Sequence, residues 1–218
     1  MQGRTVLLLL TGAVGIPVAG SAQGKSGVAV TPFIGLTVPG RDLLLRPGLT
    51  AGRDQEKQGL VGVVGGRLSI GLTEQLEVEA DVAYGSSGLK LSTLSSPSGT
   101  DAAVLAMSGR LAFRLKPTIE PFWLTIHGGV AAVSRTFSSR SGQSAGIHDA
   151  TNVGAVIGTT LGFRLGSRSA FVVGIDDFIY NASFDVDAAG TAPAGKTQSL
   201  TQNDIRITLG LRFAVAGL

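Results

Sequence analysis

The stretch LEVEADVAY, residues 76–84, places an acidic side chain at every second position and apolar side chains between them. The acidic series is Glu77, Glu79 and Asp81. Successive side chains of a β-strand point to opposite faces, so these carboxylates would share one face and the apolar residues the other. A soluble sheet would expose such a face to bulk water. The fold therefore depends on whether the carboxylates face open water or a confined interior.

Seven other segments of the chain repeat this two-residue period, which is typical of strands and not of helices. Three of the connections are tight, at 73–75, 117–120 and 166–169, and four are long and rich in Gly, Ser, Thr and Asp. The long ones cover about 39–58, 85–101, 135–151 and 181–200. Eight antiparallel strands joined alternately by short turns and long loops predict an all-β, up-and-down barrel.

Which face lies inside decides between a soluble, lipocalin-like barrel and a transmembrane one. The segments are long enough for the ~9–11 residues of a tilted membrane-spanning strand, and the polar face mixes glycine with a few long charged residues. Five phenylalanines of the apolar face gather near the short turns, as an aromatic girdle at a membrane interface would: Phe113, Phe122, Phe163, Phe171 and Phe213. These features favour an apolar exterior and a polar lumen. The exceptions are Phe33, Val61, Val63, Trp123, Val156 and Val172 on the polar face and Asp177 on the apolar one.

The first 22 residues have the layout of a secretory signal peptide. Arg4 supplies a positive charge, Val6–Val18 is apolar, and Gly20-Ser21-Ala22 is a small-residue cleavage site. We therefore expect a cleaved segment 1–22 and a single barrel domain at 23–218, with no later run long enough for a transmembrane helix. The net charge of +3 includes no dense basic cluster, which argues against nucleic-acid binding. The chain has no cysteine, so it offers no thiolate metal site or disulfide.

With these features, the chain resembles the small outer-membrane β-barrel family of Gram-negative bacteria, the OmpA/OmpX-like kind, over about residues 25–213. The resemblance implies an outer-membrane location, contact with lipid and with the outer-membrane assembly machinery, and a monomer. It brings no catalytic, cofactor or metal motif. One departure is that Ala214–Leu218 follow Phe213, whereas the family's terminal aromatic residue is the last or nearly the last.

The acidic face of 76–84 would then point into a narrow lumen, where unpaired charges are costly. Centring the first tight turn near Glu74 places Arg67 opposite Asp81. We predict a salt-bridged network that closes the lumen, the alternative being a water-filled tube. Its members are Arg67, Glu77, Glu79, Asp81, Arg110, Arg114, His127 and Arg206.

The function expected from these features is structural or surface-interacting and non-enzymatic, with long extracellular loops meeting any extracellular or envelope partner. An alternative is passage of a small solute or hydrophobic ligand through the barrel, which the apolar lumen residues support. A less favoured one is a lipid-modifying enzyme using His148, Asp149 and a serine such as Ser141 or Ser144. A calcium site from Asp176, Asp177, Asp185 and Asp187 is disfavoured, because their spacing does not match an EF-hand loop.

Overall fold

The computed structural model describes residues 27–40, 44–47, 53–91, 97–115, 122–139, 149–186 and 196–216. Ten strands form one antiparallel sheet. Their bounds are β1 Val28–Pro39, β2 Leu44–Pro47, β3 Arg53–Gln58, β4 Val61–Gly71, β5 Leu76–Leu91, β6 Pro97–Leu115, β7 Phe122–Ser139, β8 Ala150–Arg164, β9 Ser169–Val186 and β10 Lys196–Ala216. Within these ranges, no helix is long and apolar enough to cross a membrane.

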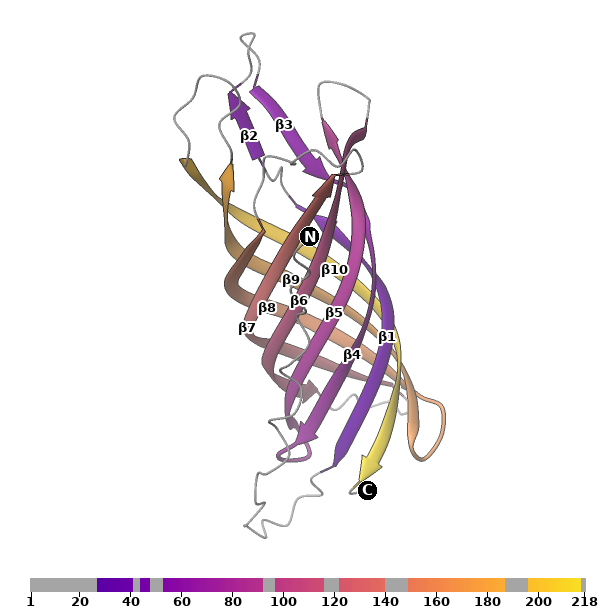
Figure 1. Ribbon diagram of the computed structural model, residues 1–218. Helices are drawn as coiled ribbons and strands as arrows, with labels where there is room; N and C mark the ends of the chain where they lie inside the picture. Colours follow the sequence, from indigo (N-terminus) through magenta and orange to yellow (C-terminus); the bar gives the residue numbers. More distant parts are fainter. Residues whose placement is uncertain are drawn as a thin grey trace, which may run out of the picture.

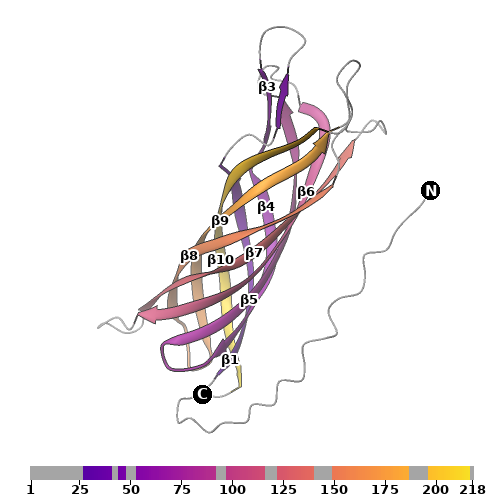
Figure 2. The ribbon, with the colours of Figure 1, turned by 90° about the vertical axis from the view of Figure 1, so that its left-hand side faces the viewer.

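Eight of the ten strands close into the predicted barrel. Each of β5 to β10 pairs with the strand before it, β4 pairs with β1, and β10 returns to pair with β1 (Figure 1). The view in Figure 2 shows the strands inclined to the long axis of the barrel, as closure requires. The closed ladder leaves no free edge among these eight strands, so their backbone groups find partners without water.

The apolar face lies outside, as predicted. Large apolar side chains cover the outer surface, with Ile34 64%, Val130 68% and Val153 72% exposed. The carboxylates of 76–84 point inward, and Glu77, Glu79 and Asp81 are at most 5% exposed. A soluble barrel would show the reverse, because burying apolar surface is what stabilises a fold in water.

The strands on the side of the long loops extend further than the sequence analysis predicted. The expected loops 85–101, 135–151 and 181–200 are partly paired strand, since β5 reaches Leu91 and β9 reaches Val186. The first expected loop contains β2 and β3, and β3 adds to the far end of β5. In Figure 1 this hairpin rises beyond the barrel at the end opposite the C-terminus. The inward positions of these segments hold polar residues such as Arg135 beside small apolar ones such as Ala182, so their period was not detected.

The apolar exceptions on the polar face fill the interior. Phe33, Val61, Val63, Val156 and Val172 are at most 7% exposed. Two of the aromatic rings fit because glycine faces them: a Cβ at Gly65 would collide with the Phe33 ring, and one at Gly162 with the Trp123 ring. Val61, Val63 and Val156 lie toward the long loops, whereas Trp123 lies near the short turns.

Asp177, the exception on the apolar face, is half-buried and accepts a hydrogen bond from the amide of Asn203 at 3.3 Å. This polar pair lies on the outer side of β9 and β10. It stands on the side of the long loops relative to the apolar residues Ile175 and Ile207.

Candidate functional site

A balanced group of buried charges crosses the middle of the lumen. This central cluster consists of Arg67, Arg110 and Arg206, of Glu79, Asp81 and Asp176, and of His127. The residues come from β4, β5, β6, β7, β9 and β10, and none is more than 7% exposed. Three guanidinium groups therefore meet three carboxylates where little water reaches them.

Two arginines of the central cluster bridge the same two aspartates. Nη2 of Arg206 lies 2.8 Å from Oδ1 of Asp81 and 2.9 Å from Oδ2 of Asp176. Nη2 of Arg110 lies 3.0 Å from Asp81, and its Nη1 lies 2.8 Å from Asp176. Three of these contacts are charge-assisted hydrogen bonds, which are strong, and the Arg110–Asp81 contact is an ion pair. Together they connect β5, β6, β9 and β10.

Arg67 has looser contacts than the sequence analysis predicted. It pairs with Asp81 in the β4–β5 register as expected, but its Nη2 lies 3.8 Å from Asp81 and 3.7 Å from Asp176. The long side chain reaches across the lumen instead, and Nη1 donates to Oγ1 of Thr160 at 3.2 Å. The residue paired with Arg67 in the strand register is therefore not its closest side-chain contact, because the arginine side chain is longer than the spacing between strands.

His127 is held against Asp176, and its Nε2 lies 2.6 Å from Oδ1 of that aspartate and 3.1 Å from Nη1 of Arg110. A hydrogen on Nε2 makes this nitrogen a donor to the carboxylate. Gly158 provides the space, because a Cβ there would lie 2.6 Å from Nε2 and 2.7 Å from Oδ1 of Asp176. His127 thus belongs to the hydrogen-bond network.

A second charged group, the turn-end group, lies nearer the short turns. It comprises Glu77, Arg114 and Arg212, with Trp123 beside them. Nη2 of Arg212 lies 3.0 Å from each oxygen of Glu77, and Nη2 of Arg114 contacts the same carboxylate. The side chains of Arg114 and Arg212 are 29% and 19% exposed, so water reaches this group.

A third group lies toward the long loops and was not predicted. In this loop-end group, Arg135 lies 2.5 Å from Oδ2 of Asp204, and the hydroxyl of Tyr180 donates to the same oxygen at 2.5 Å. Nε of Arg135 also donates to Oε1 of Gln58 at 3.1 Å. Between this group and the central cluster, Phe33 and Phe178 place their rings 5.4 and 4.6 Å from the Arg206 guanidinium.

The predicted network residues thus divide into two places. Arg67, Glu79, Asp81, Arg110, His127 and Arg206 meet in the central cluster, whereas Glu77 and Arg114 lie in the turn-end group. The sequence analysis named Asp176 only for the disfavoured calcium site and missed it as a member of the network, although it lies at an inward position of β9. It also missed Arg135, which it had assigned to a loop. The available signal was an inward polar position, within the apolar alternation for Asp176 and just beyond it for Arg135.

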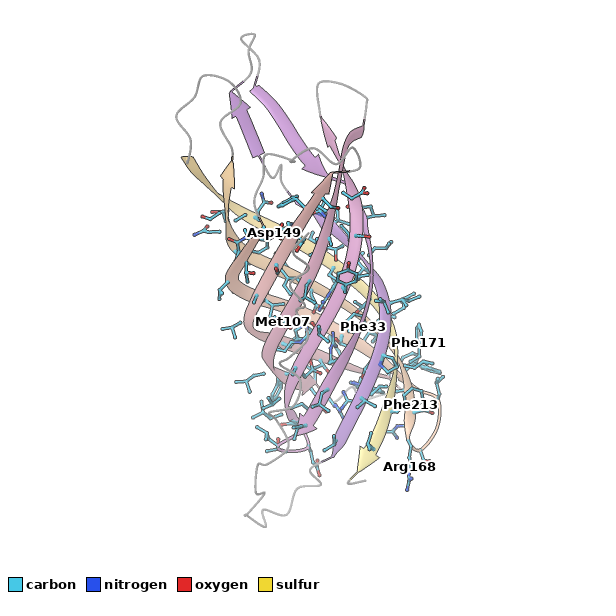
Figure 3. All side chains as sticks on the ribbon, viewed as in Figure 1. Phe33, Met107, Asp149, Arg168, Phe171 and Phe213 are labelled. Carbon is cyan, nitrogen blue, oxygen red and sulfur yellow. The ribbon has the colours of Figure 1, made fainter. Side chains whose placement is uncertain are left out.

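The five girdle phenylalanines lie on the outer surface near the short-turn end. Phe122, Phe163 and Phe171 are successive neighbours in the register of β7, β8 and β9, and the rings of Phe122 and Phe163 are 4.9 Å apart. Phe113 and Phe213 are 41% and 42% exposed on β6 and β10. Figure 3 shows Phe171 and Phe213 near the end that carries Arg168, with Asp149 toward the opposite end.

The other candidate sites gain little from the described residues. Asp149 accepts the backbone N–H of Phe137 at 3.0 Å and so ties β7 to the start of β8. His148, Ser141, Ser144 and Asp187 lie outside the described residues, as does the side chain of Asp185. In the described part of the chain, no three His, Cys, Asp or Glu side chains are grouped to hold a metal ion.

No protein-family model matches the sequence, and no curated protein matches it. Solved structures do match. Outer membrane protein AlkL aligns over 92% of this chain and 97% of its own at 16% identity, with a TM-score of 0.57. E. coli Outer Membrane Protein W covers 88% and 99% at 11% identity and 0.51, and a major outer membrane protein from Thermus thermophilus covers 86% and 99% at 11% and 0.51. With its eight closed antiparallel strands and apolar exterior, the chain has the fold of the small eight-stranded outer-membrane β-barrels.

Proposed function

We propose that the protein is a monomeric outer-membrane barrel of a Gram-negative bacterium, exported by a signal peptide at residues 1–22 and inserted by the outer-membrane assembly machinery. The support is its fold together with an outer surface of large apolar side chains, which water would not tolerate as a continuous belt. Phe113, Phe122, Phe163, Phe171 and Phe213 would lie at the periplasmic interface, as aromatic girdles do. The short turns would then face the periplasm and the long connections the exterior.

Within this membrane setting we assign a structural or surface-interacting role, without enzymatic activity, cofactor or metal. The observation that carries it is the central cluster, whose six buried charges balance and join five strands across the lumen. An open pore would instead leave such charges hydrated one by one. The barrel would present its loop-side hairpin and connections to an extracellular or envelope partner.

Passage of a small solute or hydrophobic ligand is the second candidate, favoured by the buried apolar side chains on the long-loop side of the central cluster. Val63, Ala83, Val104 and Phe178 help to line a cavity of about 10 Å³ there, bounded by Arg206 and Asp204. That volume holds about one water molecule at most. A ligand could cross only if the cluster and the loop-end group opened, so the closed barrel is the better-supported function.

Conductance across planar lipid bilayers tests the closed lumen. We expect the purified protein to give no large, steady open current. The double variant Arg206→Ala with Asp176→Ala removes one charge of each sign and the side chains that fill the lumen, so it should conduct. The matched control Leu209→Ala, on the outer face of β10, should stay closed. A large steady current from the unmodified protein would overturn the proposal.

Location is tested separately by cell fractionation. The protein should be in the outer-membrane fraction and should migrate differently on SDS gels before and after boiling, as folded barrels do. Recovery in a soluble fraction would refute the membrane assignment and leave the conductance result to be explained otherwise.

A further inference from the structure

A cavity of about 740 Å³ opens at the short-turn end of the lumen. The ends of the eight barrel strands and the turns after β4 and β8 form its wall. Its volume is within the range of pockets that bind small ligands. Deeper in the barrel the inward side chains Ser69, Glu79 and Thr125 are at most 5% exposed. The cavity therefore ends on the short-turn side of the central cluster.

Positive charge predominates in this cavity. Among the described residues, four arginines and two glutamates line it: Arg114, Arg164, Arg168 and Arg212 with Glu74 and Glu77. The described part of the wall thus carries an excess of two positive charges, in contrast to the balanced central cluster. A concave wall of one sign concentrates the electrostatic field and attracts ions of the opposite sign.

The arginines of the wall are positioned before any ligand arrives. Glu77 contacts both Arg114 and Arg212, which holds these guanidinium groups at the side of the cavity. Arg114 also lies over the Trp123 ring, 5.4 Å from its centroid, and its buried Nε makes no hydrogen bond among the described residues. One carboxylate shared by two guanidinium groups leaves donors available. Preorganised donors bind an oxyanion with little further ordering cost.

We propose that this cavity is a binding site for a small polyvalent oxyanion, one that carries two or more phosphate or carboxylate groups. Two or more anionic groups match the separated guanidinium groups on β6, β8 and β10 and in the turn after β8. The central cluster closes the inner end of the cavity, so a ligand could enter and leave only at the short-turn end. This inference goes beyond the proposed function and does not depend on the orientation of the barrel in a membrane.

The only tryptophan of the chain, Trp123, lines the cavity and reports on its contents. Refolded protein in a non-ionic detergent would be titrated with inorganic pyrophosphate and, separately, with citrate, while tryptophan fluorescence is recorded. Sodium chloride at matched ionic strength controls for screening, and sucrose controls for a neutral solute. We expect a saturable change with at least one of the two anions. A response to pyrophosphate alone identifies phosphate as the recognised group, and a response to citrate alone identifies carboxylate.

Variants of opposite sign sharpen the test. Arg164→Gln, at an exposed side chain, should lower the affinity for the anion by about tenfold. Glu77→Gln should raise that affinity several-fold, because two guanidinium groups lose their internal partner. Arg53→Gln on β3, at the opposite end of the barrel, removes the same charge and should change nothing. Heat-modifiable gel migration checks that each variant is folded.

Two results would overturn the proposal: a fluorescence response no larger than that to sodium chloride, or an affinity that Arg164→Gln and Arg53→Gln lower equally. Neither result would affect the closed-barrel function, which the conductance and fractionation experiments test independently. If Glu77→Gln does not fold, the Arg164→Gln and Arg53→Gln comparison still decides the matter.

Discussion

The central cluster and the turn-end group are made of the same residue types but differ in their surroundings. In the central cluster Arg206 and Asp81 are 1% and 0% exposed in their side chains, and cations balance anions. In the turn-end group Arg212 is 19% exposed, and cations exceed anions in the cavity that it lines. A buried charge depends on its partner, whereas a hydrated one is also served by water. One lumen can therefore contain both a buried charge network that stabilises the fold, the central cluster, and a water-accessible cationic surface, the turn-end group.

The largest effect is expected from Arg206→Ala in the central cluster. It would remove the shortest contact of Asp81 and the hydrogen bond to Oδ2 of Asp176 in a dry interior. Breaking such a buried pair costs about 3–5 kcal/mol of unfolding free energy, to be measured by urea titration in detergent. Thr208→Ala, a buried inward side chain two residues along β10, is the control. If the free energy of unfolding falls by less than about 1 kcal/mol, as for a solvated ion pair, the central cluster would be no more structural than the turn-end group.

The comparison assumes that both groups lie inside, and Leu209→Arg tests that assumption on the same strand. Leu209 is 45% exposed on the outer face, between the inward positions of Arg206 and Arg212. An arginine facing lipid near the midplane costs about 2–4 kcal/mol. Folding into lipid vesicles should be impaired, with Leu209→Met as the apolar control. If the arginine variant folds into vesicles as well as the control does, the assigned faces are wrong.

Arg212→Ala in the turn-end group should have a much smaller effect than Arg206→Ala. Glu77 keeps its contact with Arg114, and water enters the cavity beside it. We expect a loss of about 1 kcal/mol or less in the same urea titration. A loss as large as that of Arg206→Ala would mean that the turn-end group is as structural as the central cluster.

The smallest effect is expected from a deletion between β9 and β10, which provides a baseline because it removes no residue of either group. Removing residues 188–194, between the described ends of β9 and β10, changes the loop-closure free energy by only about 0.6 kcal/mol per twofold change in loop length. Deletion of 181–200 would do more, because it removes paired strand including the Asn181–Thr201 hydrogen bond of 3.0 Å. A barrel that no longer folds without 188–194 would make that segment structural.

The barrel itself was predictable because its physical signal is local. Strands that separate lipid from a polar lumen must alternate, and residues 76–84 and 204–213 alternate clearly. The register of β4 and β5 followed from the tight turn between them, which placed Arg67 opposite Asp81. Where the strands continue past the apolar belt, alternation ends, so β2, β3 and the far ends of β5 and β9 were assigned to loops.

The composition of the central cluster was only partly predictable, because its contacts cross the lumen. Asp176 and Asp81 are on strands that do not pair, and they meet through Arg206 and Arg110. Such contacts depend on how the strands are staggered around the barrel, which local sequence does not encode. For the same reason Arg135 and Asp204 were not recognised as partners, although they are separated by only 2.5 Å.

The central claim is that the carboxylates of LEVEADVAY face buried cations, and a double-mutant cycle on Arg206 and Asp81 tests it most directly. The single changes Arg206→Ala and Asp81→Ala and their combination would be compared by urea titration in detergent, with Arg212 and Glu77 as the reference pair. We expect a coupling energy of about 2–3 kcal/mol for Arg206 and Asp81, and less than about 1 kcal/mol for the reference. Additivity within about 0.5 kcal/mol for Arg206 and Asp81 would contradict the account, because it would mean that the two side chains do not interact inside the barrel.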